Sequence, residues 1–332
     1  MTAAFRVAVV GLGWWGRTVA AALRGSGLVS VVLGADPSAA GRTAGEELGL
    51  RMANSLEEVL QAPNIDGVVL CTPHTAHAGQ IVAAARAGKH VFCEKPLCTS
   101  GEEAEWALGE VAEHGVTLGV GHERRFEPPV VDLLRRVRAG EFGTPLVFEG
   151  AFSQDKFLGM DPGNWRLSPE VSPVGPLSAT GVHLVDLSIA LLGAPTQVWA
   201  RMATLGSELP NGDTLTVTIG FESGATALLT SVLATPFFGR AMLVGSSGWV
   251  EVRDRNHPED PQGWDVVRKR RGAPAVTEFV PPHPAVRDNS EQWAKAALGG
   301  SPYPIPVEEM RWTVRTYEAV VRSVASGRVE SP

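Results

Sequence analysis

Short apolar runs alternate with helical patterns along the first 120 residues. The runs cover residues 6–10, 30–33, 67–71, 90–93 and 116–120. Between them lie alanine-rich or amphipathic stretches that end in a glycine, as helices often do: Gly25, Gly49, Gly88 and Gly115. Two stretches begin with capping-box spacing, Ser55 with Glu58 and Ser100 with Glu103. Apolar strands separated by helices predict βαβ units around a doubly wound parallel sheet, which is the Rossmann pattern of an α/β domain.

The pattern changes after Gly121. We expect a helix at 129–138, a strand at 146–152, an irregular Pro/Gly-rich segment at 153–176 and an amphipathic helix at 182–192. Residues 198–252 look like consecutive strands with turns at 222–224 and 246–248, and helical patterns return at 285–298 and 307–325. This order predicts a second domain of the α+β class, with an open, mostly antiparallel sheet and helices on one face.

A glycine motif opens the first helix, directly after the first strand: Gly11, Leu12, Gly13, Trp14, Trp15 and Gly16. In a GxGxxG motif the first glycine permits a tight turn, the second lets a diphosphate approach the backbone, and the third lets helix and strand pack closely. Asp36 ends the second strand about 20 residues later, where a carboxylate accepts hydrogen bonds from the adenosine ribose. Together these features predict a dinucleotide site, against the alternative that the glycines serve a tight turn only. We expect NAD rather than NADP, although Arg42 could support NADP if it folded back.

We therefore place an NAD(P)-binding Rossmann domain at residues 1–122. An α+β domain for substrate binding and oligomerisation follows at 123–332, with the C-terminal helix able to pack back on the first domain.

Composition excludes several classes of function. The net charge is −7, which gives no general attraction to nucleic acid or to an anionic membrane, and we expect the basic run at 268–271 to be a solvated loop or strand end. Three cysteines without CxxC spacing predict reduced thiols and no zinc site, so we expect no metal. No apolar stretch is long enough to span a bilayer. The first strand begins too close to Met1 for a signal peptide, so we expect a cytoplasmic protein.

The segment at 93–96 carries the most specific chemistry. Glu94 and Lys95 follow the strand at 90–93, and ligands of open α/β sheets bind beyond the carboxyl ends of strands. Lysine is scarce, at five of 29 basic residues. Lys95 is therefore a candidate donor or acid/base group. The alternative is a surface lysine at a strand end.

The chain resembles the Gfo/Idh/MocA oxidoreductases, the family of glucose-fructose oxidoreductase and inositol dehydrogenase, over nearly its whole length. The resemblance rests on the glycine motif and on five further segments: Cys71-Thr72-Pro73 with His77, Glu94-Lys95-Pro96, Gly121 with Arg124-Arg125-Phe126, Trp165-Arg166, and Gly181-Val182-His183-Leu184-Val185-Asp186. It implies that Lys95 binds the reacting hydroxyl, that His183 takes its proton, and that hydride passes to the nicotinamide. It also implies two sets of contacts, with cofactor at Thr72, Pro73, His77, Glu94 and Lys95, and with substrate at Arg124, Trp165, Arg166 and Thr180.

The sequence departs from the family pattern beside His183. Relatives carry an aspartate four residues before this histidine, where this chain has Ala179, and we consider Asp186 as a replacement that orients the imidazole. His74 stands where an asparagine is expected, and Glu123 where many relatives have asparagine before the Arg-Arg pair. These changes affect the expected substrate more than the cofactor.

Three functions remain open. The first is oxidation of a secondary alcohol on a sugar, an inositol or another cyclic diol, where aromatic residues such as Phe157 and Trp165 favour a flat ring. The second is a non-redox decarboxylase or lyase on the same scaffold, and the third is dinucleotide binding without turnover. Lys156 and Arg166 could pair with a substrate carboxylate. The resemblance further implies a homodimer or homotetramer built through the second sheet.

Overall fold

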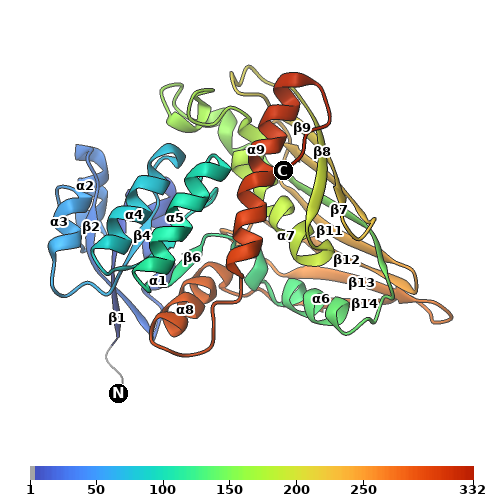
Figure 1. Ribbon diagram of the computed structural model, residues 1–332, viewed down its shortest axis with the longest axis horizontal. Coiled ribbons are helices and arrows are strands. Elements are labelled where there is room, and N and C mark those ends of the chain that lie inside the picture. The colour runs from blue at the N-terminus through green and yellow to red at the C-terminus, as the bar shows by residue number, and fades with distance from the viewer. Residues whose placement is uncertain (1–3) are drawn as a thin grey trace. The chain divides into compact units, whose positions relative to one another are not determined.

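The computed structural model describes residues 4–332, which divide into two compact units (Figure 1). The first unit contains the chain up to Glu123 together with residues 284–310. The second contains residues 124–283 and 311–332. Segment 284–310 therefore departs from our expected second domain, and the C-terminal helix, from Arg311 onward, belongs to the second unit and not to the first.

The first unit is a six-stranded parallel sheet in the order β3-β2-β1-β4-β5-β6. Its strands are β1 (Phe5–Val10), β2 (Val29–Ala35), β3 (Arg51–Ala53), β4 (Gly67–Leu70), β5 (His90–Cys93) and β6 (Leu118–Val120). Its helices are α1 (Trp14–Leu23), α2 (Ala39–Glu47), α3 (Leu56–Gln61), α4 (His77–Arg86), α5 (Gly101–Glu113) and α8 (Ala285–Ala297). The strand order reverses between β1 and β4, which is where such sheets bind dinucleotides. The predicted Rossmann fold is confirmed.

Helix α8 packs against the core of this unit, and its largest contribution is one tryptophan. Trp293 is fully buried, and its ring lies 5.2 Å from that of Phe5 and 5.7 Å from that of Phe92. Its indole Nε1 donates a hydrogen bond to the carbonyl of Thr117 at 3.1 Å. A segment more than 160 residues away in the chain therefore completes the core of the first sheet, a contact that local patterns cannot predict.

The two expected capping boxes are present in a shifted form. Ser55 and Ser100 are N-cap residues whose hydroxyls accept from the amides of Glu58 and Glu103. The glutamates reach one residue further back than in the standard box, to the amides of Asn54 and Thr99. Each reciprocal pair satisfies two amide donors at a helix start.

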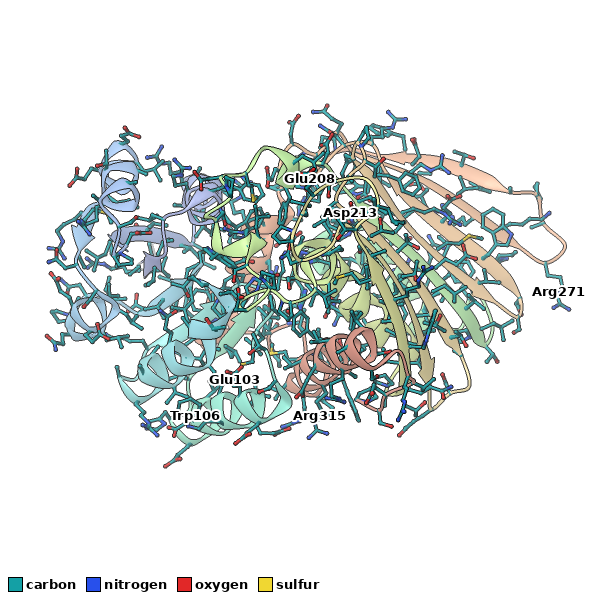
Figure 2. The ribbon with its side chains drawn as sticks, turned by 90° about the horizontal axis from the view of Figure 1, so that it is seen from above. Glu103, Trp106, Glu208, Asp213, Arg271 and Arg315 are labelled. Carbon is teal, nitrogen blue, oxygen red and sulfur yellow. The ribbon has the colours of Figure 1, made fainter. Side chains whose placement is uncertain are left out.

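The second unit holds an eight-stranded sheet in the order β14-β13-β12-β11-β7-β10-β9-β8. Only β7 and β10 pair in parallel. The strands are β7 (Pro145–Ser153), β8 (Pro195–Ala203), β9 (Thr214–Phe221), β10 (Thr226–Val232), β11 (Phe238–Gly245), β12 (Gly248–Asp254), β13 (Trp264–Arg270) and β14 (Val276–Val280). The predicted α+β domain is confirmed, and the basic run ends β13, with Arg271 at the tip of the β13–β14 hairpin (Figure 2).

Three longer helices cover one face of this sheet: α6 (Pro128–Arg138), α7 (Val182–Leu192) and α9 (Val307–Ser326), of which α9 belongs to this unit from Arg311 onward. A π-helical turn, η5 (Leu177–Gly181), leads directly into α7. The prediction that α7 is amphipathic was wrong, because ten of its eleven residues are buried. It lies inside the core, where all faces of the helix are covered.

Candidate active site

The three glycines of the motif have different surroundings. Gly11 has φ +88°, and a β-carbon there would lie 2.7 Å from the carbonyl oxygen of Cys71. A β-carbon at Gly16 would collide with the carbonyl of Gly11. Gly13 is exposed, and a β-carbon there would meet nothing within 4 Å. The open space above Gly13 is the cradle that a diphosphate needs against the backbone.

Helix α1 begins at this open side of the loop. Its N-cap residue is Gly13, which supplies no side-chain acceptor for the first-turn amides. Trp14 and Trp15 follow with their rings 5.9 Å apart and partly exposed, whereas the Leu12 side chain is buried in the core. Amides without a cap and the positive end of the helix dipole together fit a bound diphosphate.

Asp36 supports the glycine loop directly. Its Oδ2 accepts from the amide of Leu12 at 2.7 Å, and its Oδ1 accepts from the amide and hydroxyl of Ser38 at 2.8 and 2.6 Å. A β-carbon on Gly41 would collide with this carboxylate. Sequence reasoning gave Gly41 no role. Arg42 folds back on the same turn, where its Nη1 donates to the carbonyls of Pro37 and Asp36 at 2.8 and 3.2 Å.

His77 joins the two loops that leave β4 and β5. Its Nδ1 lies 2.8 Å from the carbonyl oxygen of Pro96, and its Nε2 lies 3.0 Å from that of Thr72. The imidazole has no exposed surface, and burial lowers its pKa, opposed by hydrogen bonds to these carbonyls. The Thr72 hydroxyl donates to Oε1 of Gln80 at 2.6 Å, and Thr72 and Pro73 are partly exposed. His77 thus lies behind the loops rather than on their surface.

Lys95 differs from its neighbours in exposure. From Val91 to Cys98 every residue is buried except Lys95, which is partly exposed. The buried Glu94 carboxylate accepts from the amide of Lys95 at 3.2 Å, and a β-carbon on Gly121 would collide with that carboxylate. The peptide bond between Lys95 and Pro96 is cis. The loop thus leaves a single ammonium-bearing side chain accessible beyond the carboxyl end of β5.

His183 lies in the first turn of α7, in the second unit. It is 2% exposed, and its ring lies 5.9 Å from that of Phe152. Asp186 does not orient this imidazole as we had considered. Within residues 4–332 neither oxygen of Asp186 accepts a hydrogen bond, and its Oδ2 lies 3.4 Å from Nε of Arg125. Burial raises the pKa of Asp186 to about 6, opposed by the Arg125 charge.

Two of the expected substrate contacts are enclosed by the protein. Arg124 is 1% exposed, and its Nη2 donates to both oxygens of Asp254 at 3.0 and 2.8 Å. Asp254 also accepts from Nε1 of Trp264 at 2.9 Å. Thr180 is 1% exposed and donates to the carbonyl of Pro176 at 3.2 Å. Both side chains are thus buried and hydrogen-bonded within the second unit.

Trp165 and Arg166 remain accessible. Both are partly exposed, and the Arg166 guanidinium lies 4.2 Å from the centre of the Trp165 ring. The backbone beneath them is held by Asn211, which the sequence analysis missed. The buried Asn211 amide donates to the carbonyls of Arg166 and Ser172 at 2.7 and 2.9 Å. No short-range pattern could have identified it, because its partners lie about 40 residues earlier in the chain.

Lys156 contacts two side chains of the second unit, Glu259 and His257. Its Nζ lies 2.6 Å from Oε2 of Glu259 and 3.0 Å from Nδ1 of His257. The His257 ring lies 5.9 Å from that of Phe152, which also borders His183. The expected role of Lys156 as an available cation is therefore not supported.

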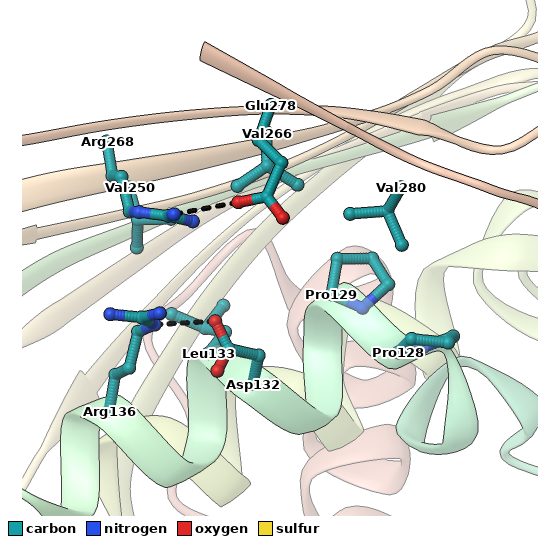
Figure 3. Close-up of a pocket in the computed structure, with 10 residues that line it drawn as sticks. All are labelled: Pro128, Pro129, Asp132, Leu133, Arg136, Val250, Val266, Arg268, Glu278 and Val280. Atoms are coloured by element: carbon teal, nitrogen blue, oxygen red, sulfur yellow. Dashed lines mark hydrogen bonds and ion pairs between the residues drawn. The ribbon is translucent and has the colours of Figure 1, made fainter. Parts of the chain in front are cut away.

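A hollow of about 300 Å³ lies elsewhere in the second unit, between α6 and strands β12–β14 (Figure 3). Its walls include Pro129, Leu133 and Val266. The charged residues at its rim already pair with one another, Arg136 with Asp132 and Arg268 with Glu278. None of the predicted site residues lines it.

Comparison with known proteins agrees with this architecture. Residues 5–122 match a family model described as an oxidoreductase family with an NAD-binding Rossmann fold, and residues 130–251 match the GFO/IDH/MocA C-terminal domain. The chain is 32% identical over 265 residues to scyllo-inositol 2-dehydrogenase (NAD⁺) of Bacillus subtilis, covering 76% of this chain and 75% of that protein.

Two further similarities are informative. The uncharacterized oxidoreductase YrbE of Bacillus subtilis is 34% identical over 183 residues, which span 54% of this chain and only 52% of that protein. The crystal structure of aldose-aldose oxidoreductase from Caulobacter crescentus superimposes with a TM-score of 0.86 at 24% identity, covering 99% of this chain and all of the other. The latter shows the shared fold. On the family models and the inositol dehydrogenase together, the chain belongs to the Gfo/Idh/MocA oxidoreductase family.

Proposed function

We propose that the protein is an NAD(P)-dependent dehydrogenase that transfers hydride between the nicotinamide and a secondary alcohol on a sugar, an inositol or another cyclic diol. The observation that carries the proposal is the isolated exposure of Lys95 in an otherwise buried turn at the carboxyl end of β5. That turn belongs to an NAD-binding Rossmann domain whose Gly13 leaves room for the diphosphate. The activity of the inositol dehydrogenase relative has the same character.

Bound NAD would supply the hydride acceptor, since no protein side chain accepts hydride. In this mechanism the Lys95 ammonium donates a hydrogen bond to the reacting hydroxyl and stabilises negative charge on its oxygen. The His183 imidazole accepts the hydroxyl proton, as imidazole commonly does in general base catalysis. Trp165 and Arg166 offer a flat surface and a cation to the rest of the ring.

His77 has a positioning role in this proposal. We propose that it positions the loops after β4 and β5 rather than touching the cofactor, because both its ring nitrogens face backbone carbonyls of those loops. Glu94 has a similar task, since its carboxylate accepts the amide of Lys95. Thr72 and Pro73 keep their proposed place along the cofactor.

NAD is the preferred cofactor in this proposal. The Asp36 carboxylate lies at the end of β2, where it disfavours a 2′-phosphate by charge. Its oxygens hold the glycine loop as well, so its proposed ribose contact is additional to that structural task. Because Arg42 folds over the same turn, we keep NADP as a second cofactor.

The decisive experiment follows nicotinamide absorbance while the protein is incubated with NAD or NADP and a panel of sugars, inositols and cyclic diols. Cofactor reduction supports the dehydrogenase. Loss of a compound without net reduction would support the decarboxylase or lyase alternative, and cofactor binding without any turnover would support a binding protein.

A variant links that activity to Lys95. Lys95→Ala should lower kcat by about 100-fold or more, as expected for loss of a positioned hydrogen-bond donor to the oxygen that becomes negative, while NAD binding stays near normal. Lys295→Ala, on α8, is the matched control and should leave kcat unchanged. Full activity of Lys95→Ala would overturn the assigned mechanism.

We also propose a homodimer or homotetramer formed through the outer face of the second sheet, in the cytoplasm. The helices α6, α7 and α9 all pack on the inner face, where Phe148, Leu243 and Val250 are buried. The outer face exposes large apolar side chains, including Trp199 and Leu228. Among residues 4–332, no helix has the length and apolar character to cross a membrane.

A further inference from the structure

Ala179 is the one exposed point in a long buried segment. Every residue from Val174 to Ile189 is buried except Ala179, which is partly exposed. It lies in the π-helical turn η5, four residues before His183, so both side chains lie on the same side of the helix about one turn apart. Turns of this kind recur at functional sites. Ala179, whose side chain is only a methyl group, is therefore the partly exposed residue one turn before the proposed base.

Ala179 borders a group of buried apolar side chains. Ala179 packs against a cluster formed by Phe157, Leu167, Leu209 and Leu233, joined by Met160. These residues come from four separate segments, so the cluster is not a by-product of one element's periodicity.

The polar neighbours of Ala179 face away from the exposed point. The hydroxyl of Ser178 lies 2.8 Å from that of Tyr317, inside the core. The hydroxyl of Thr180 donates to the carbonyl of Pro176. Neither side chain is exposed, so neither can bind a substrate hydroxyl at Ala179.

We propose that Ala179, backed by this buried cluster, forms an apolar subsite beside the reacting carbon. The preferred substrate is a ring alcohol that presents a C–H or CH₂ edge to it: a deoxy or anhydro sugar or a carbocyclic diol, rather than a fully hydroxylated pyranose or inositol. The inference rests on the proposed dehydrogenase activity and names its substrate class. A hydroxyl forced against this surface would lose its water without gaining a partner.

The first test compares substrates on the unchanged protein. We would measure kcat/KM with NAD for pairs that differ by hydroxyl groups, such as 1,5-anhydroglucitol against glucose, 2-deoxyglucose against glucose, and trans-1,2-cyclohexanediol against myo-inositol. In at least one pair the less hydroxylated compound should be favoured by about 10- to 100-fold, the discrimination that an apolar pocket gives against an added hydroxyl. Preference for the fully hydroxylated member in every pair overturns the subsite while leaving the dehydrogenase intact.

The second test moves the preference. Ala179→Asp places a hydrogen-bond acceptor at this partly exposed position and should shift the kcat/KM ratio of a pair by about 10-fold or more toward the hydroxylated member. Ala179→Asn supplies a neutral group of the same shape and should shift it in the same direction. Ala190→Asp adds a carboxylate to the far end of α7, about 10 Å along the helix from His183, and should leave the ratio unchanged.

The outcomes separate two failures. If no compound in the panel reduces NAD although NAD binds, the proposed dehydrogenase falls and the subsite falls with it. If compounds are oxidised but the ratio is unchanged in the folded Ala179 variants, the subsite alone is wrong. Melting temperatures of the variants establish which of them are folded, and the comparison of substrates on the unchanged protein needs no variant.

Discussion

Gly13 and Gly16 belong to one motif, yet a methyl group would meet opposite surroundings at the two positions. At Gly13 it enters open space, and at Gly16 it collides with the carbonyl of Gly11. Gly13→Ala should therefore leave the melting temperature nearly unchanged and weaken NAD binding by about 10-fold or more, because the methyl occupies the place of the diphosphate. Gly16→Ala should lower stability by about 1–3 kcal/mol through overpacking. Calorimetric titration with NAD and thermal unfolding measure both effects, and unchanged NAD affinity in Gly13→Ala would place the diphosphate elsewhere.

Asp36 and Arg42 permit a test of cofactor choice. Asp36→Asn removes the charge that repels a 2′-phosphate and keeps a side chain of the same shape near Leu12 and Ser38. The ratio of the NADP to the NAD dissociation constant should therefore fall by about 10-fold, or roughly 1.4 kcal/mol of binding free energy. Arg42→Ala should weaken NADP and leave NAD unaffected. Direct titration of both nucleotides into each variant gives the ratios. A ratio that is the same in all three proteins would remove both residues from cofactor selection.

At the scale of elements, the carboxylate of Asp213 accepts hydrogen bonds across the loop between β8 and β9. Figure 2 labels Asp213 and Glu208, which lies in the same loop. Burial tends to raise the pKa of Asp213, but donors from Leu205, Thr214, Ser207 and Gly206 outweigh it and hold the pKa below its usual value. A lowered pKa stabilises the fold above the unfolded-state pKa, and this contribution is lost as pH falls through the folded-state value. The same loop carries Leu209 of the apolar cluster.

Asp213→Asn should therefore cost about 1.5–3 kcal/mol at neutral pH, the range for hydrogen bonds to a charged group. The difference from the unchanged protein should shrink in acid, where Asp213 itself becomes protonated. Urea unfolding at neutral and acidic pH measures both differences. Glu208→Gln, at an exposed position in the same loop, is the control and should change stability by less than about 0.5 kcal/mol. A cost of Asp213→Asn that is independent of pH would contradict the argument.

The sequence predicted elements whose signals are local and missed those that depend on distant partners. The strands and helices around the glycine motif follow from apolar runs and caps. Strand β3 has only three residues, too few to show alternation, and β14 is exposed at four of its five positions, so it lacks a buried face. The position of α8 depends on Trp293 filling the first core, which composition cannot reveal.

The candidate site divides in the same way. Lys95 and His183 are identified by short motifs, whereas the enclosure of Arg124 depends on Asp254, 130 residues later. The sequence shows Ala179 in place of a carboxylate. It does not show that Phe157, Leu167, Leu209 and Leu233 surround it, because these residues converge from four segments of the chain.

At the scale of the whole molecule, the outer face of the second sheet has a continuous row of cross-strand neighbours. The register pairs Trp199 with Thr218, Thr218 with Leu228, and Leu228 with Glu149. Trp199 is 41% and Leu228 46% exposed, and no helix of the described chain covers them. Exposed apolar side chains on an uncovered sheet favour self-association, and a symmetric pair of sheets is the simplest closed arrangement.

Leu228→Lys tests this association with little risk to the single chain. The new ammonium would lie at an exposed position opposite Glu149, which already pairs with Arg240, so the single chain should still fold. In an interface between two sheets it would bury a charge away from water, and the dimer or tetramer should dissociate by at least one step. Sedimentation velocity at micromolar concentration measures the change. Leu205→Lys, at a position 76% exposed in a loop outside the sheet, should leave the assembly intact. An unchanged protein that sediments as a monomer, or a Leu228→Lys variant that keeps its full assembly, would show that this face is not the interface.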